Sequence, residues 1–564
     1  MERLERLFRQ EMRTLRAEGG LFADDFPESA RFLGGHSDRE SEQDPYVDRL
    51  TEGAALLLAR VREALIVEQD GFSKLLSEVV APGLDRALPS VAVVKFPLRS
   101  DFTGPARLER GTPVVGARGR SGTIFRLCHD VPLEQVAIRS ARIDKLDSGA
   151  DVLEIEIAKT SQDKTRPWPK SLPMFLFGDG PVVWTLRFGL LRRLRAIEVF
   201  SGGSWEAHRR ISVARLDQPG YCIETGETTP FTDLRDFLCT DERFRFVSLD
   251  GLDELSHLPR LKIRFVFHGT VPRGIAKSIA AGTIHFHTGV VVNEFMEPCH
   301  AVDWDHSSTS QPLRPVGGAH REILDVRNVV GVCAQPPSER IRYRRYSAFR
   351  AASQEGWFQL LESGQANGRR GWSIALGCPI DRGLDNQSVA VEAVCSDGDH
   401  PHDALQPSHF SRVAMDVPPR VSVTGLTRPT QSYRFPREAD SRSMLLAFAA
   451  GHFDGWLDAT RLKDALMHLA WDPSESKRTL IEAIQDVQTR SDHVLRNGVA
   501  WRRMTAIVRL RDTTCTPETW DRLGVIDAFG SVLFGLVQDS TPIGSRTRLQ
   551  LAVDPAGIIL EWEN

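Results

Sequence analysis

The spacing of apolar residues changes along this chain of 564 residues, and that change constrains the fold more than any single motif. In the first 90 residues apolar side chains recur every three or four positions, which is typical of amphipathic helices. From about residue 91 to 440 they alternate with polar residues, as in half-buried strands. Helical spacing returns after residue 425, and strand-like alternation follows it. The pattern predicts a multidomain α+β protein with an N-terminal helical region, β-rich middle domains and a C-terminal α+β domain.

One stretch of the helical region has an unusually wide apolar stripe. A helix is expected from Asp44-Pro45, since Asp caps free amides and Pro fits the first turn. This helix is expected to run to Gln69. A further helix is expected from Phe72 and should end at Pro82-Gly83. A single neighbouring helix would cover only part of the stripe. We therefore expect a partner interface on this helix, at Val47, Leu50, Leu57, Leu58, Val61 and Leu65.

The chain is too long for one hydrophobic core, so several domains are expected. The changes of period and the turn-rich segments suggest four divisions. These are a helical assembly region at 1–90, a first β-rich domain at 91–255, a second at 256–425 and a C-terminal α+β domain at 426–564.

Composition argues against several classes of partner. The formal net charge is −4, so no global field attracts nucleic acid or anionic lipid. We find no signal peptide and no apolar run near the roughly 20 residues of a transmembrane helix. The eight cysteines have no paired spacing, which favours reduced thiols. These features predict a cytoplasmic protein that binds no nucleic acid and does not insert directly into a membrane.

The common catalytic motifs are missing from the sequence. It has no GxxxxGK[ST] loop, no HExxH, no GxSxG and no GxGxxG between a strand and a helix. We therefore expect no enzyme, no catalytic residues and no cofactor.

The pair His285 and His287 is the best enzyme-like feature. Residues i and i+2 of a strand share a face, so the two imidazoles could converge on a metal in a β-barrel enzyme. Further polar candidates follow at Glu294, Glu297, His300, Asp303, Asp305 and His306. The favoured alternative places Ile284 and Phe286 in a core, with both histidines on a polar or interface face. The eleven tryptophans raise a third alternative, a carbohydrate-binding surface, but they are dispersed.

Several runs in matching order resemble one known family. The most specific are Asp44–Glu52 (DPYVDRLTE), Arg110-Gly111-Thr112, Leu234–Phe237 (LRDF), His287–Pro298 (HTGVVVNEFMEP) and Gly425–Thr430 (GLTRPT). Together they resemble the TssF family, also called VasA or ImpG, of type VI secretion baseplate subunits. The likeness extends from about residue 5 to 540.

This resemblance implies a structural role without catalysis. A family member would form a baseplate wedge, with two TssF copies and one TssG, joined by TssK, TssE and the VgrG spike. Tube and sheath would polymerise from that baseplate, which docks at the inner-membrane complex from the cytoplasm. The family uses the segment around His287 without metal ligands, so the resemblance implies no metal or cofactor.

Overall fold

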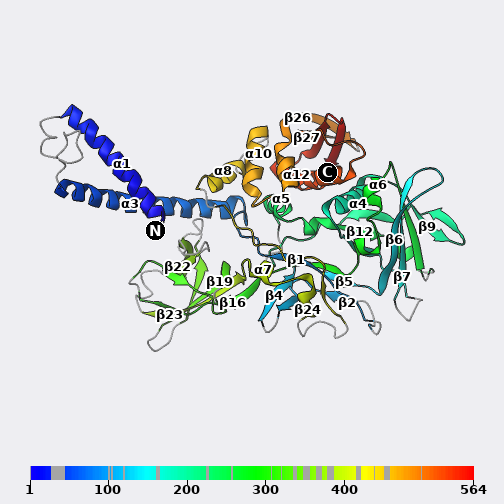
Figure 1. Cartoon of the computed structure of the whole chain (residues 1–564), viewed down its shortest axis with the longest axis horizontal. Helices are drawn as coiled ribbons and strands as arrows, with labels where there is room; N and C mark the ends of the chain where they lie inside the picture. The colour runs from blue at the N-terminus through cyan, green and yellow to red at the C-terminus, as the bar shows by residue number, and fades with distance from the viewer. Residues whose placement is uncertain are drawn as a thin grey trace. The chain divides into compact units, whose positions relative to one another are not determined.

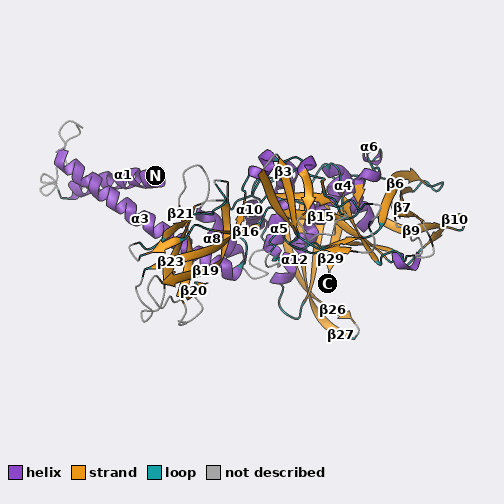
Figure 2. Ribbon diagram, turned by 90° about the horizontal axis from the view of Figure 1, so that it is seen from below, coloured by secondary structure: helices purple, strands orange, loops and turns teal. Residues whose placement is uncertain are grey.

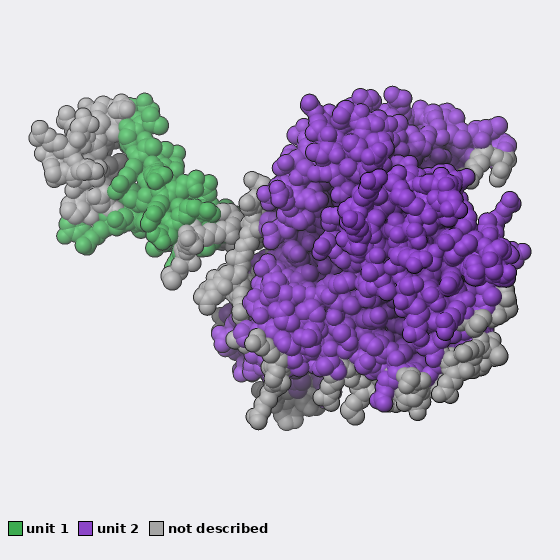
Figure 3. All heavy atoms as spheres, turned by 45° about the vertical axis from the view of Figure 1, so that its right-hand side comes forward, with its two compact units in different colours: residues 1–79 green, residues 80–564 purple. Residues whose placement is uncertain are grey.

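The computed structural model describes residues 2–26, 45–99, 102, 106–118, 121–160, 166–223, 228–255, 258, 260–305, 308–318, 320–333, 340–346, 356–363, 371–377, 386–413, 421–436, 439–449, 458–496 and 498–564. The chain forms two compact units, Met1–Val79 and Val80–Asn564 (Figure 3). Each unit is described by itself below.

The first unit is a pair of helices, α1 (Glu2–Asp25) and α3 (Pro45–Val80), which lie side by side (Figures 1 and 2). Arg62 of α3 pairs with Glu11 of α1. The two helices expected between Asp44 and Pro82 are one continuous α3. That expectation was wrong because a glycine inside a helix, here Gly71, costs only about 1 kcal/mol and does not break it. Asp44 itself lies outside the described residues.

The second unit begins with a six-stranded sheet built from distant parts of the chain. Its strands run in the order β24-β3-β4-β15-β1-β25. A small sheet of β2 and β5 lies in the same part of the sequence. Their bounds are β1 (Val91–Lys95), β2 (Ala106–Leu108), β3 (Pro113–Arg118), β4 (Ser121–Leu127), β5 (Val131–Leu133), β15 (Thr288–Val292), β24 (Phe410–Val413) and β25 (Thr424–Gly425).

Two further sheets come from residues 136–285. One is five-stranded in the order β10-β9-β13-β7-β6, and the other is four-stranded in the order β11-β12-β8-β14. Their bounds are β6 (Val136–Lys145), β7 (Asp151–Lys159), β8 (Ser171–Leu176), β9 (Leu194–Ser201), β10 (Ser204–Ala207), β11 (Ser212–Arg215), β12 (Phe246–Asp250), β13 (Arg260–Phe267) and β14 (Ile284–His285).

An eight-stranded sheet occupies residues 295–396 and has a hydrophobic core of its own. It runs β16-β23-β19-β20-β21-β22-β18, and β17 also pairs with β23. Its bounds are β16 (Phe295–Pro298), β17 (Val302–Trp304), β18 (Gln311–Leu313), β19 (Glu322–Cys333), β20 (Arg340–Arg345), β21 (Gly356–Ser363), β22 (Gly371–Gly377) and β23 (Gln387–Ser396).

The C-terminal sheet runs β26-β27-β28-β29. Strands β27 and β28 are parallel neighbours, and helix α12 supplies the crossover that such a pair requires. Their bounds are β26 (Ile484–Arg496), β27 (Val499–Arg511), α12 (Trp520–Ser540), β28 (Arg546–Asp554) and β29 (Ile558–Glu563). The other α-helices among the described residues of this unit are α4 (Gly180–Arg192), α5 (Pro230–Cys239), α6 (Arg273–Ala276), α7 (His400–Ala404), α8 (Ala439–Ala449), α10 (Ala459–Leu469) and α11 (Glu475–Glu482).

The largest core joins the C-terminal segment to the middle of the chain, and α12 lies at its centre. Leu523, Phe529 and Leu533 of α12 are buried there, and α12 packs against α4 and α5. Asp527 of α12 accepts hydrogen bonds from Arg187 (2.8 Å) and Arg192 (2.7 Å) of α4. A buried carboxylate needs such partners, because it would otherwise lose its hydration without compensation.

The fold class agrees with the sequence, and three local expectations need correction. Helices α4 and α5 lie within the stretch expected to be strands. The helical spacing of Leu480, Ile481, Ile484 and Val487 predicts one helix, but α11 ends at Glu482 and the last two of these residues belong to β26. Helix α12 is long and apolar enough to cross a membrane, contrary to the sequence expectation, but most of its apolar stretch is buried inside the protein.

The four domain divisions stay a prediction. Strand β1 pairs with β15 and β25, so the six-stranded sheet takes strands from both sides of residue 255.

Candidate functional site: the apolar face of helix α3

Helix α3 presents a row of large apolar side chains to solvent. Leu57 is 66% exposed, and four neighbours on the same side of the helix are also exposed: Leu50, Leu58, Val61 and Leu65. Residues three, four and seven positions apart share one side of an α-helix. We name these five residues the α3 face. Contiguous exposed apolar side chains of this kind are typical of protein interaction sites.

A different side of α3 packs against α1. Ala55 and Ala59 are fully buried, and Leu7 of α1 is buried as well. The ion pair between Arg62 and Glu11 lies on this side. The buried alanines and the ion pair to α1 lie on one side of α3, and the residues of the α3 face are exposed on another side.

The structure thus brings together five of the six interface residues expected from sequence. The sixth, Val47, lies in α3, but its side chain is outside the described residues. Sequence reasoning missed the contact made by Ala55 and Ala59. These two small residues are four positions apart, which is a spacing that could have indicated helix packing. The interface prediction rested only on the larger leucines and valines.

The pair His285 and His287 does not form a metal-binding arrangement. His287 has φ +52°, so the chain leaves β14 there and the two residues are not on one regular strand. The Nδ1 atom of His285 lies 3.2 Å from Lys95 Nζ, whereas Nε2 of His287 accepts the Glu134 amide at 3.2 Å. Glu294 is paired with Arg86 at 2.9 Å. No group of three or more potential ligands is found in the part of the chain that the structure describes, and His306 lies outside it.

The environment of these histidines favours their neutral forms. Burial, and then the charge of Lys95, lowers the pKa of each to about 4. Ile284 and Phe286 are buried, as the favoured alternative expected. His287 is buried too and has φ +52°, so it does not lie on the exposed polar or interface face that the favoured alternative expected for both histidines.

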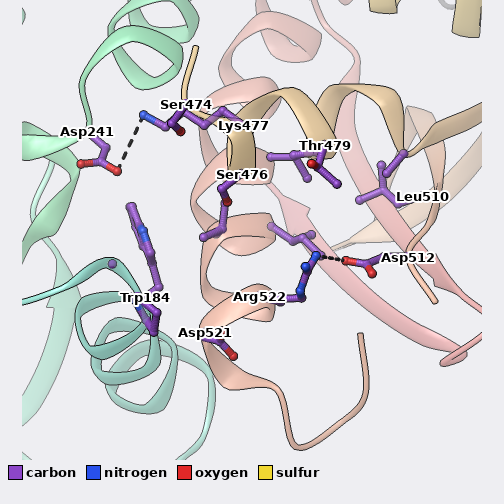
Figure 4. A pocket seen from close by; sticks show the side chains of 16 residues that line it. Trp184, Asp241, Ser474, Ser476, Lys477, Thr479, Leu510, Asp512, Asp521 and Arg522 are labelled. Atoms are coloured by element: carbon purple, nitrogen blue, oxygen red, sulfur yellow. Dashed lines mark hydrogen bonds and ion pairs between the residues drawn. The ribbon is translucent and has the colours of Figure 1, made fainter. Parts of the chain in front are cut away.

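A cleft of about 320 Å³ lies between α4, α11, α12 and β27 (Figure 4). Trp184, Leu480 and Ile526 provide apolar lining. Its two cations already have partners: Lys477 Nζ lies 3.7 Å from Asp241, and Arg522 donates to Asp512 at 2.8 Å. No histidine or cysteine is among its lining residues, which include the hydroxyls of Ser474, Ser476 and Thr479 and the carboxylates of Asp241, Asp512 and Asp521.

A comparison with models of known protein families shows which family the chain belongs to. The family model described as "Type VI secretion system, TssF" matches residues 1–564, the full length. The chain belongs to the TssF family. A curated TssF relative, the type VI secretion system component TssF1 of Pseudomonas aeruginosa, is 32% identical over 145 residues. That match covers 25% of this chain and 23% of the relative, so it spans under a quarter of the relative's length.

Chains of two solved type VI secretion baseplate structures share the fold. A chain of the TssK-TssF-TssG baseplate subcomplex of a type VI secretion system matches with a TM-score of 0.75 at 20% identity, over 92% of this chain and 98% of that one. A chain from a second structure, of the baseplate complex from the type VI secretion system, matches with a TM-score of 0.58 at 19% identity, over 100% of this chain and 99% of that one.

Proposed function

We propose that this TssF-family chain is a structural baseplate subunit of a type VI secretion system. It assembles with TssG-type and TssK-type subunits and catalyses no reaction. The whole-length family match carries this proposal. The folds shared with chains of the TssK-TssF-TssG subcomplex and of a baseplate complex support it.

The α3 face is the proposed contact with a TssG-type helix. Its leucines and valines have the spacing that packs against a second helix, and α1 occupies another side of α3. Each large aliphatic side chain buried there contributes roughly 1.5–3 kcal/mol. Several such residues together are enough to hold a helix of a partner.

The wider assembly follows the family resemblance. Two copies of the chain join one TssG-type subunit, with TssK, TssE and the VgrG spike, and the baseplate nucleates tube and sheath. The assembly is cytoplasmic and docks at the inner-membrane complex. The rival proposal, a metal-dependent enzyme at His285 and His287, has no support from the geometry, because each imidazole contacts a separate protein group.

The test is Leu57→Asp, with Leu56→Asp as its matched control. Both residues are exposed on α3, but at about 100° per residue Leu56 lies about 160° from Leu58 and about 140° from Val61 around the helix, so it is outside the α3 face. An aspartate at position 57 would bury a charge without a partner in the proposed interface. We expect Leu57→Asp to lose co-purification with the TssG-type subunit and to lose secretion, while Leu56→Asp keeps both.

Circular dichroism separates an interface effect from misfolding. Leu57 is mostly exposed in the chain alone, so both variants should keep the helix and strand signals of the parent. If Leu57→Asp binds the TssG-type subunit and secretes as well as the parent, the α3 face is not the interface.

A further inference from the structure

The β26–β27 hairpin continues beyond the sheet that supports it (Figure 2). Strand β28 pairs with β27 only from Arg503 onward. Among the described strands, the last four residue pairs of the hairpin, from His493↔Arg502 to Arg496↔Val499, therefore pair only with each other. We name residues 493–496 and 499–502 the arm. A two-stranded ribbon without a sheet beside it is marginal in water, so a second surface is expected to stabilise it.

The arm carries exposed apolar side chains on both of its faces. Leu495 is 75% exposed, and Val499 is also exposed. Cross-strand partners share a face and successive residues alternate, so Trp501 and Val499 lie on one face and Leu495 on the other. A flat surface would cover one face only. This arrangement suits insertion of the arm into a cleft.

Trp501 has two neighbours within the protein. The guanidinium of Arg546 lies 5.5 Å from the centre of its ring, and Val494 is its cross-strand partner. The residue is still 37% exposed, whereas Trp520, Trp168 and most other tryptophans that the structure describes are buried. Tryptophan and arginine are the residues that most often dominate protein interfaces. A side chain that already has neighbours loses less freedom when a shaped protein cleft binds it.

The charge around the arm is positive. Arg490 and Arg502 are exposed, and neither has a carboxylate partner among the described residues; Arg502 donates to Ser491 Oγ at 3.0 Å. Asp492, the nearby acid, already accepts from Arg503 at 3.0 Å. Two uncompensated arginines at the base of an apolar arm are complementary to an acidic opening around an apolar interior.

We propose that the arm is a docking element that inserts into an apolar cleft with an acidic mouth on a protein partner. The contact is separate from the α3 face and does not depend on it. A variant that disables the arm should therefore still co-purify with the TssG-type subunit through α3.

The test uses the full chain with benzoylphenylalanine, a photo-crosslinking residue, in place of Leu495, in cells that assemble the secretion apparatus. Ile543, a fully exposed aliphatic residue outside the arm, is the matched control position. Crosslinks from position 495 should map to one protein, at peptides rich in Asp and Glu. Arg490→Glu with Arg502→Glu should reduce their yield at least about tenfold. Position 543 should give no such product.

Two further measurements complete the test: the level of secretion, and the binding of the chain to lipid vesicles. Leu495→Asp with Trp501→Ala should lower secretion at least about tenfold with an unchanged melting temperature, and Ile543→Asp should not lower it. The proposal is overturned by parent-level secretion, or by crosslinks from position 495 that match the control. It is overturned equally by crosslinks between two copies of this chain, or by sedimentation with phosphatidylglycerol vesicles that requires Trp501.

Discussion

Helices α3 and α12 are both long and rich in apolar residues, but their apolar side chains lie in different environments. In α12, Leu523, Phe529 and Leu533 are buried against α4, α5 and the C-terminal sheet. In α3, Leu57 and its neighbours are exposed. The sequence pattern of the two helices is similar in kind, since both repeat apolar residues at helical spacing. The difference shows that an apolar stripe predicts burial, but only the tertiary structure tells whether the same chain or another protein supplies the cover.

A change of glycine to alanine is expected to have opposite effects in the two helices. A Cβ added to Gly524 of α12 would lie 2.2 Å from the carbonyl oxygen of Trp184, so α4 and α12 could not keep their present distance. We expect Gly524→Ala to destabilise the second unit by roughly 3 kcal/mol, the upper end for overpacking a core. The midpoint of urea unfolding, followed by tryptophan fluorescence, measures this. An unchanged midpoint would show that the helix pair tolerates separation.

A fall in pH should lower the stability of the second unit. Burial lowers the pKa of His129, His285 and His287 in the second unit to about 4, against an ordinary value of about 6.5. The unfolded chain therefore binds more protons between these values, and stability falls as the pH falls from 6.5 towards 4. The slope is on the order of 1 kcal/mol per pH unit for each histidine.

Tryptophan fluorescence reads this effect in the second unit alone, because no tryptophan precedes Trp168. The thermal midpoint should fall between pH 7 and pH 5. Replacement of the exposed His300 by Gln is the control and should leave the dependence unchanged. A midpoint independent of pH in this range would mean that the three imidazoles are not kept neutral by the fold.

The smallest effect is expected at Gly53 of α3, where an added Cβ meets nothing within 4 Å. Alanine is the better helix former, so Gly53→Ala should stabilise α3 by about 0.5–1 kcal/mol. Slower amide exchange in α3 would show this, with binding of the TssG-type subunit unchanged. Loss of that binding would mean that the partner approaches α3 closely at Gly53.

The sequence predicted the helix from Pro45, the α+β class and the alignment of the α3 leucines in one apolar stripe, because these follow from local periodicity. It did not predict that Gly71 lies inside one helix, since a single glycine is tolerated when the rest of the helix forms. Helix α4 was missed because Gly178–Pro181 has the composition of a turn, yet Pro181 occupies the first turn of a helix. The arm was also missed, because the exposure of Leu495 and Trp501 depends on where β28 begins, which no local pattern gives.

Amide hydrogen exchange on the chain, alone and with the TssG-type subunit, shows whether the α3 face is the interface. We expect the subunit to slow exchange in residues 50–65 of α3 by at least about tenfold, since contact with a second helix suppresses local opening. Exchange in α12 should not change, because its side chains are already buried. Unchanged exchange at 50–65 in a complex that has formed would contradict the account.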